Sequence, residues 1–176
     1  MSLRADLRTA TADDHARLDV MFGRFDLGDR AAYRGFLTAH ARALAPVEAA
    51  ILASGDTAGW HPRFPLVAAD LVAIGAPVPA ALTLDMPKPA ALWGMRYVVE
   101  GSRLGGAMLA RQVGPGLPSA YLGAQHGRGE WRAFLETLES HGEAGGAAWR
   151  AGAVAGAREA FALFARSAAM EDGVDG

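Results

Sequence analysis

The sequence contains no cysteine among its 176 residues. This absence excludes disulfide bonds, thiolate zinc sites, iron–sulfur clusters and cysteine nucleophiles together. Any metal must therefore be held by histidine, by carboxylates or through a cofactor. Lysine is nearly absent too, because arginine outnumbers it sixteen to one, and the formal net charge is −2. The chain therefore lacks the overall basic field that nucleic-acid binding needs, and we expect no nucleic-acid partner.

Long hydrophobic runs are missing as well. No stretch reaches the roughly 20 apolar residues of a membrane span, and the N-terminal MSLRADLRTATADDH is too polar for a signal peptide. We therefore expect a cytoplasmic protein with no membrane partner. A chain of this length is typical of one domain, which we place at residues 1–170. The tail at 171–176, EDGVDG, is predicted to be disordered.

Several motifs that carry chemistry are absent. The chain has no H-E-x-x-H, no P-loop lysine motif, no G-x-G-x-x-G and no G-x-S-x-G. It also lacks the paired Glu-x-x-His motifs of a di-iron carboxylate bundle. Zinc-protease, nucleotide-binding, serine-hydrolase and di-iron chemistry have no support in this sequence.

Apolar residues recur at helical spacing through most of the chain, and few stretches alternate like strands. The sequence therefore predicts an all-α, single-domain, multi-helix bundle. Ser2 and Asp29 are expected to cap helices, and Pro46 to kink a helix or mark its boundary. The expected helices cover residues 2–23, 29–54, 66–75, 89–113, 129–141 and 146–170, with about two turns more within 119–127.

Residues 89–113 combine a long helical pattern with glycines in the interior of the expected helix. One narrow stripe of the helix contains Gly94, Val98, Gly101, Gly105 and Met108, and Gly106 lies beside it. Each interior glycine costs roughly 0.5–1 kcal/mol relative to alanine, so something must approach this backbone closely. Either a partner helix or a flat ligand meets that requirement. The pair Gly105-Gly106 also permits a kink.

Histidines are the plausible nitrogen ligands, and five are present. His15 lies at the edge of the first helix's apolar stripe, with Asp19 one turn further on, where a carboxylate can orient an imidazole. It is read either as a ligand or as a structural residue. His40 is predicted to lie in the core, and His61, His126 and His141 are predicted to lie at the surface. Arg8 and Arg132 are candidates for contacting acidic groups of a ligand.

Two segments together resemble the signature helices of the heme oxygenase family, especially its bacterial branch associated with phytochromes. The segment ATADDHARLD at 10–19 is similar to the family's proximal helix, and YVVEGSRLGG at 97–106 is similar to its distal helix. The likeness runs from about residue 3 to residue 168 and includes AREAFALF near the C-terminus. The resemblance implies that His15 is the axial ligand of heme iron. It further implies that Gly101, Gly105 and Gly106 let the distal backbone lie directly over the heme.

The resemblance also implies an activity. Heme would be both substrate and cofactor, and dioxygen would open it to biliverdin with release of carbon monoxide and iron. Electrons would come from a separate ferredoxin or reductase, and a bacteriophytochrome is a possible acceptor of the biliverdin. The implied catalytic residues are Ser102, Gly101 and Gly105, with Arg8 and Arg132 near the heme propionates. Many family members have an aspartate where this chain has Ser102, whereas the bacterial branch tends to have Gly-Ser.

Two other functions are compatible with the same residues. The first is a heme carrier or sensor that uses the same fold without catalysis, which is favoured if Ser102 does not support oxygen activation. The second is a helical protein that binds no heme, in which the glycines merely pack helices together. Turnover of heme separates the first alternative from an enzyme, and substitution of His15 tests the second.

Overall fold

The computed structural model describes residues 2–171, which form helices and no strand. The predicted all-α fold is therefore confirmed for this part of the chain, whereas residues 172–176 of the expected disordered tail lie outside it. The helices are α1 (Leu3–Ala10), α2 (Ala12–Phe22), α3 (Arg30–Ser54), α4 (Phe64–Ala73), α5 (Pro89–Gly101), α6 (Arg103–Ala110), α7 (Ala120–Gly123) and α8 (Glu130–Glu171).

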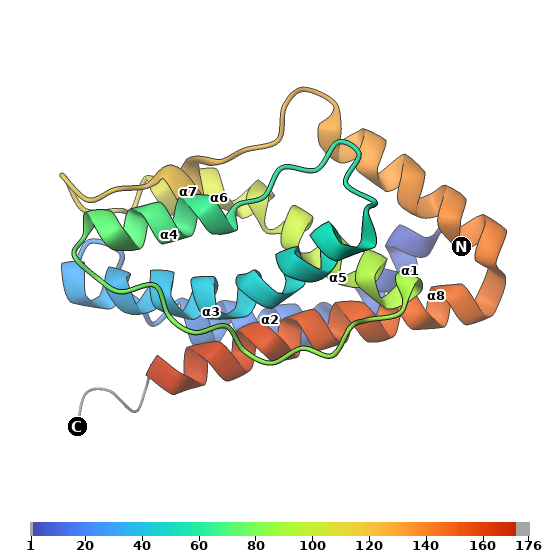
Figure 1. Cartoon of the computed structure of the whole chain (residues 1–176), viewed down its shortest axis with the longest axis horizontal. Coiled ribbons are helices and arrows are strands. Elements are labelled where there is room, and N and C mark those ends of the chain that lie inside the picture. The colour runs from blue at the N-terminus through green and yellow to red at the C-terminus, as the bar shows by residue number, and fades with distance from the viewer. Residues whose placement is uncertain (1, 172–176) are drawn as a thin grey trace.

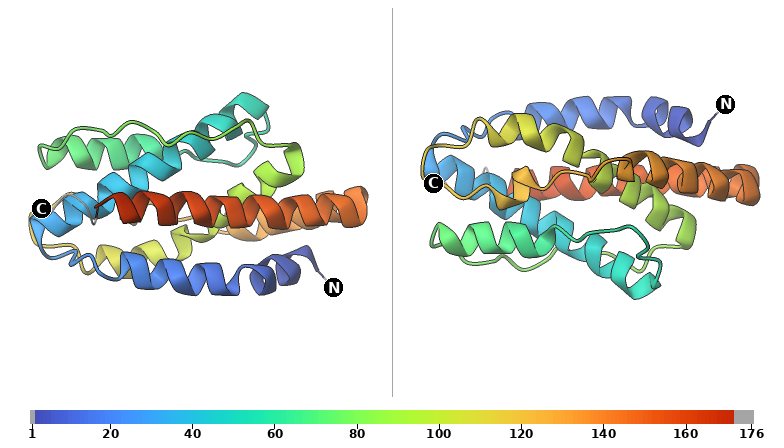
Figure 2. Two further views of the ribbon diagram at one scale, coloured as in Figure 1. Left: turned by 90° about the horizontal axis from the view of Figure 1, so that it is seen from below. Right: turned by 90° about the horizontal axis from the view of Figure 1, so that it is seen from above.

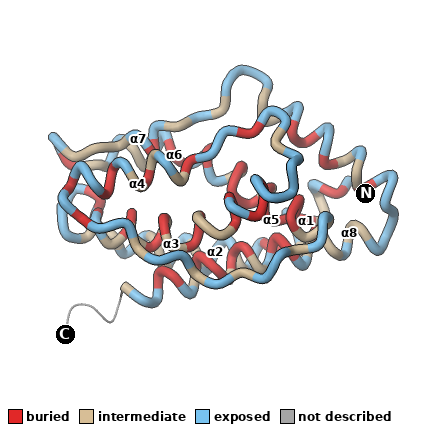
Figure 3. Tube along the Cα trace, viewed as in Figure 1, coloured by how far each residue is buried: buried red, intermediate tan, exposed pale blue. Residues whose placement is uncertain are grey.

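The second half of α8 runs along the long axis of the molecule and is its central helix (Figure 1, Figure 2). Seen from below, α1 and α2 lie along one side of α8 and α4 lies on the other, while α3 runs obliquely from the level of α8 toward the side of α4 (Figure 2). Helices α1, α2, α3 and α5 all pack against α8. The buried residues of α3, α5 and α8 form the core between these elements (Figure 3).

Helices α5 and α8 cross at glycines. A Cβ on Gly94 would collide with the carbonyl of Ala153 in α8, and a Cβ on Gly156 would collide with the carbonyl of Ala91 in α5. The two backbones can approach this closely because neither position carries a side chain. Gly94 is therefore explained by the close packing of α5 against α8 and not by a ligand.

Pro46 lies inside α3 and does not end it. Proline has no N–H, so the carbonyl of Arg42 one turn earlier loses its helical donor. The N–H of Leu82, in the link between α4 and α5, donates to that carbonyl instead, with an N···O distance of 3.0 Å. Among residues 2–171, α3 is long and apolar enough to cross a membrane by length and composition. However, 56% of its most apolar stretch is buried inside the fold.

The segment expected to form one helix over 2–23 is broken at Thr11. The Thr11 hydroxyl and its backbone N–H both donate to the carbonyl of Leu7, at 2.8 and 3.0 Å. Thr11 is thus bonded to the last turn of α1 and has φ −111° and ψ 11°, which are not helical, so α1 ends before it and α2 begins after it. The two helices expected at 129–141 and 146–170 are both present within the element labelled α8, because Gly146, with a φ of 62° and a ψ of −159°, interrupts the helical backbone between them.

The predicted bend in the glycine-bearing segment is displaced from its expected position. The sequence suggested a kink at Gly105-Gly106, but α5 ends at Gly101 and α6 begins at Arg103. The carbonyl of Val99 accepts hydrogen bonds from the Ser102 hydroxyl and from the Arg63 guanidinium. Side chains that enter the backbone ladder in this way interrupt a helix.

Candidate functional site

His15 lies on α2 with its side chain 65% exposed. Its Nδ1 is 3.0 Å from Oδ2 of Asp19, one helical turn further on, as the sequence pattern predicted. The other side of the ring lies edge-on to Phe161 of α8, with 5.9 Å between ring centroids. Because Nδ1 is engaged by the carboxylate, Nε2 is the nitrogen left for a ligand.

Helix α2 has an apolar face that the protein does not fully cover. Leu18 and Phe22 pack partly against the core, but no residue of α2 is fully buried. Val20, two residues from both Leu18 and Phe22, lies on the opposite side of the helix and is 74% exposed. An amphipathic helix normally buries its apolar stripe, so α2 has surface available for a further apolar partner.

The three glycines predicted around the distal helix differ in their surroundings. No atom outside its own helix lies within 4 Å of the Cβ position at Gly105, and Gly101 meets only the edge of Trp131 at 3.6 Å. A Cβ on Gly106 would come within 2.6 Å of the carbonyl of Leu122 in α7. Packing therefore explains Gly106, whereas Gly105 leaves its backbone open to the outside.

Apolar side chains flank this open backbone on α6. Leu104 is 57% exposed and Met108 is 70% exposed, and helix geometry places both on the same side of Gly105. Helix α6 rests on α5 and α7, whereas α2 rests on α8 and α1. In the views from above and below, α2 and α6 run along the same side of the molecule (Figure 2). Each of the two helices thus carries exposed apolar groups that its own neighbours do not cover.

Ser102 lies at the break between α5 and α6, where Arg63 holds it. A terminal nitrogen of Arg63 donates to Oγ of Ser102 and to the carbonyl of Val99, with both distances at 2.5 Å. The Ser102 hydroxyl in turn donates to the Val99 carbonyl at 2.7 Å. The proton of this hydroxyl is therefore used within the helix, and its oxygen remains able to accept from water.

Arg63 is a functional candidate that the sequence interpretation missed. It is 3% exposed, and its guanidinium lies 5.1 Å from the centroid of the Tyr121 ring. The carboxylate of Glu48 accepts from the backbone N–H of Arg63 and of Phe64, at 2.7 and 2.8 Å, and so positions the start of α4. Burial raises the pKa of Glu48, against the lowering effect of these N–H groups and of Arg63.

His40 lies between Tyr121, which contacts Arg63, and Phe22 of α2. Its Nδ1 lies 2.7 Å from the Tyr121 hydroxyl, and its ring packs against Phe22 with 4.5 Å between centroids. Burial, with a smaller effect from Arg63, lowers the pKa of His40 to about 3. His40 is half-buried among the aromatic rings of Phe22, Phe36 and Phe164, close to its predicted place in the core, and the lowered pKa keeps its imidazole neutral at physiological pH.

Of the three histidines predicted at the surface, one is covered by the fold, one is partly covered and one is exposed. The His126 side chain is only 10% exposed, with Nε2 2.9 Å from the carbonyl of Glu100 and Nδ1 3.6 Å from its carboxylate. His141 is half-buried and lies 4.6 Å from the ring of Trp93. Tertiary contacts cover both imidazoles although each lies near a loop. His61, by contrast, is 69% exposed as predicted.

No protein-family model matches the chain. A heme oxygenase from Xanthomonas campestris pv. campestris (strain 8004) is 38% identical over 154 residues, which cover 81% of this chain and 92% of that protein. The chain belongs to the heme oxygenase family. A crystal structure of the NO- and CO-bound heme oxygenase from Neisseria meningitidis covers 98% of this chain and 93% of its own, with a TM-score of 0.83 and 22% identity. That structure shows the same fold.

Within this heme oxygenase fold, the two arginines predicted near the propionates are both at the surface. Arg8 is exposed, and together with Arg4 it opposes the rise in the pKa of Tyr97 that burial causes. Arg132 is 84% exposed, with its Nε 3.3 Å from Glu136. Arg132 and Arg4 also line a groove of about 530 Å³. Propionate contact stays a prediction for both Arg8 and Arg132.

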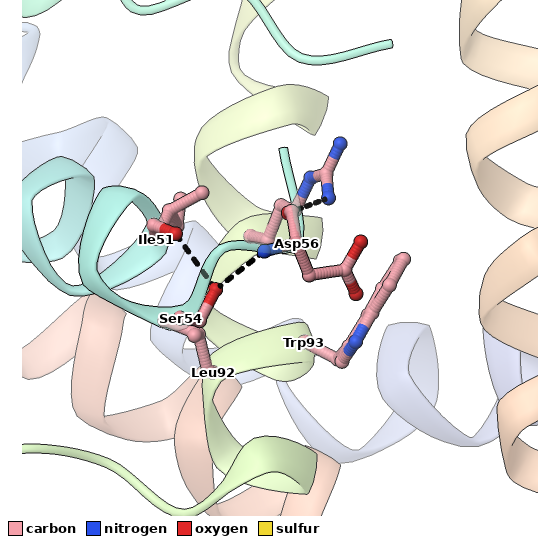
Figure 4. Close-up of a pocket in the computed structure, with 6 residues that line it drawn as sticks. Ile51, Ser54, Asp56, Leu92 and Trp93 are labelled. Carbon is pink, nitrogen blue, oxygen red and sulfur yellow. Dashed lines mark hydrogen bonds between the residues drawn. The ribbon is translucent and has the colours of Figure 1, made fainter. Parts of the chain in front are cut away.

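A second cavity lies between the first turns of α5 and the end of α3 (Figure 4). Its volume of about 10 Å³ is the space of a single water molecule. Trp93 and Asp56 border it, and Arg96 donates to the carbonyl of Asp56 at 3.1 Å. The Nε of Arg96 has no hydrogen-bond partner among the described residues, so one water fits there and a heme does not.

Proposed function

We infer that this protein is a heme oxygenase that opens heme to biliverdin and releases carbon monoxide and iron. The observation that carries the proposal is the pairing of two open features on separate helices. His15 is exposed and its Nδ1 contacts Asp19, while no atom beyond the chain neighbours and helix backbone of Gly105 lies within 4 Å of its Cβ position. A flat macrocycle needs an axial nitrogen on one face and room for a small molecule on the other.

The residues present fit heme. The apolar surface of α2 around Leu18, and that of α6 around Leu104 and Met108, would cover a hydrophobic macrocycle. We propose that Nε2 of His15 ligates the iron, since Asp19 holds the other nitrogen. Arg8 and Arg132 lie at the surface, where they are able to meet carboxylates without being buried.

Heme supplies the iron that binds dioxygen and the carbon bridge that is oxidised. The protein's part is to place water and protons beside it. We propose that the glycines leave space for dioxygen next to the α5–α6 break, and that Ser102 accepts a hydrogen bond from an ordered water there. The guanidinium of Arg63 donates a hydrogen bond to the Ser102 hydroxyl oxygen and so holds it in one orientation. Gly101 and Gly105 contribute through their missing side chains.

Electrons must enter from another protein, because the chain has no flavin or nucleotide motif. A ferredoxin or a reductase is the proposed donor, and dioxygen is the proposed co-substrate. We further propose a cytoplasmic location and, as in the phytochrome-associated branch that the sequence resembles, a bacteriophytochrome that accepts biliverdin. Co-expression with a phytochrome apoprotein, followed by the absorbance of the bile-pigment adduct, tests this last step.

The proposed function is tested by titrating the purified protein with hemin and then adding a reductant and oxygen. The expected result is a histidine-ligated Soret spectrum, followed by bile pigment. His15→Ala should lose that spectrum, whereas the matched control His61→Ala, also an exposed histidine, should keep it. An unchanged Soret band in His15→Ala would show that His15 is not the ligand.

The bonding of Ser102 favours a second candidate function, a heme carrier or sensor. Its hydroxyl proton is directed at Val99, so the serine does not itself donate outward. If water held there cannot take over this role, heme would bind without being opened. Stable ferrous protein under oxygen with no pigment would identify a carrier, whereas pigment formation identifies the enzyme.

A further inference from the structure

Aromatic rings form a continuous series of contacts from the α5–α6 break to the kink in α8. We call this series the aromatic array. Neighbouring centroids along it are between 4.6 and 6.0 Å apart. In spatial order, its members are Tyr97, Trp131, Phe134, Trp93, His141 and Trp149.

The two ends of the array lie in different surroundings. At one end, the edge of Trp131 is 3.6 Å from the Cβ position of Gly101, a residue of the proposed heme site. At the other end, Trp149 is half-buried next to solvent. It lies over Gly145, where a Cβ would collide with its side chain, beside the kink in α8 at Gly146. The array thus joins the proposed site to the surface.

The composition of the array is suited to one-electron oxidation. Three of the chain's four tryptophans belong to it, and the chain has no cysteine to act as an alternative donor. Indole and phenol groups lose an electron far more readily than phenyl or imidazole groups. Between Trp131, Trp93 and Trp149, each step crosses only one ring that resists oxidation, Phe134 or His141.

We propose that the aromatic array carries oxidising equivalents from the heme site to Trp149 when a peroxide oxidises the heme without opening it and is itself reduced to water. This inference rests on the heme binding in the proposed function. In each event, one electron passes from Trp149 to the oxidised heme centre, which is reduced by one electron, and the indole N–H proton passes to water. A thiol or ascorbate in solution then returns one electron and one proton to Trp149.

A buried cation determines where oxidation collects. The guanidinium of Arg96 lies 5.0 Å from the centroid of Trp93 and 5.4 Å from that of Phe134. Its positive charge stabilises the neutral ring and opposes a second positive charge on it. Trp93 therefore passes the oxidising equivalent on without retaining it. Oxidation products should accumulate at Trp149 and not at Trp93.

The test uses the full chain loaded with hemin and one equivalent of hydrogen peroxide as oxidant. Freeze-quenched samples are examined by electron paramagnetic resonance, and oxidised tryptophans are located by peptide mass spectrometry. A tryptophan radical and oxidised Trp149 are expected only in the hemin-loaded sample. In Trp149→Phe, which keeps a ring against His141, the radical signal should fall several-fold and damage should move to Tyr97 and Trp131.

Two further variants define the path. Trp131→Phe should leave the Soret band in place but suppress oxidation at Trp149. Trp60→Phe is the matched control, since Trp60 is a buried tryptophan outside the array and should change neither result. Oxidation of Trp149 that persists in Trp131→Phe, or that occurs equally without hemin, refutes the proposed path. Failure to bind hemin overturns both this inference and the proposed function, whereas hemin binding without oxidised Trp149 overturns this inference alone.

Discussion

Replacing Gly105 with alanine separates the stability of the helix from its proposed role in ligand binding. The new methyl group meets no atom within 4 Å outside its own helix, so it creates no clash. Alanine in a helix is favoured over glycine by about 0.5–1 kcal/mol. For a domain of this size, the ligand-free variant should melt roughly 1–4 °C higher than the parent protein.

The same methyl group should weaken heme binding, because it occupies the space where a macrocycle would approach the backbone. Overpacking of this kind costs about 1–3 kcal/mol. The hemin dissociation constant should therefore rise by roughly fivefold to 150-fold. Differential scanning calorimetry of the ligand-free protein and a hemin titration followed at the Soret band measure the two effects.

Two matched variants make this prediction sharp. Gly123→Ala also adds a methyl with no atom within 4 Å, but on α7, and it should leave hemin affinity unchanged. Gly106→Ala brings the methyl to 2.6 Å from the Leu122 carbonyl and should destabilise the protein by about 1–3 kcal/mol. If Gly105→Ala stabilises the protein and hemin affinity does not change, the open glycine has no role in binding heme.

Two further predictions concern the core. Gly94→Ala should lower the free energy of unfolding by about 1–3 kcal/mol or more, because its methyl would collide with the carbonyl of Ala153. Urea denaturation measures this change. An unchanged urea midpoint would contradict the close crossing of α5 and α8. Burial lowers the pKa of His40 from its ordinary value of 6.5 to about 3 in the folded protein, so below pH 6.5 the unfolded state binds a proton that the folded state does not. Stability should fall by about 1.4 kcal/mol per pH unit as the pH drops through that window. His40→Gln should remove this part of the slope, and an unchanged slope would assign it to other groups.

The candidate site was only partly visible in the sequence. His15 and Asp19 are one helical turn apart, so local helix geometry alone brings them together, and the structure has them at 3.0 Å. Arg63 is separated from Ser102 by 39 positions and lies in what read as a polar loop, so no local pattern linked them. The one available signal was Glu48, a lone acid in an apolar helix, which turns out to hold the Arg63 backbone.

The sequence by itself determined the all-α class, most helix boundaries and the family, because helical periodicity and two short motifs are local properties of the chain. Tertiary structure alone decided what each glycine does. Gly94 and Gly106 pack against other backbones, whereas Gly105 faces open space. It also decided that the helix breaks at Ser102 and that His126 is covered. A helical wheel shows which way each glycine faces but not what lies there. Only the folded chain decides whether a distant segment packs against that glycine or leaves it exposed.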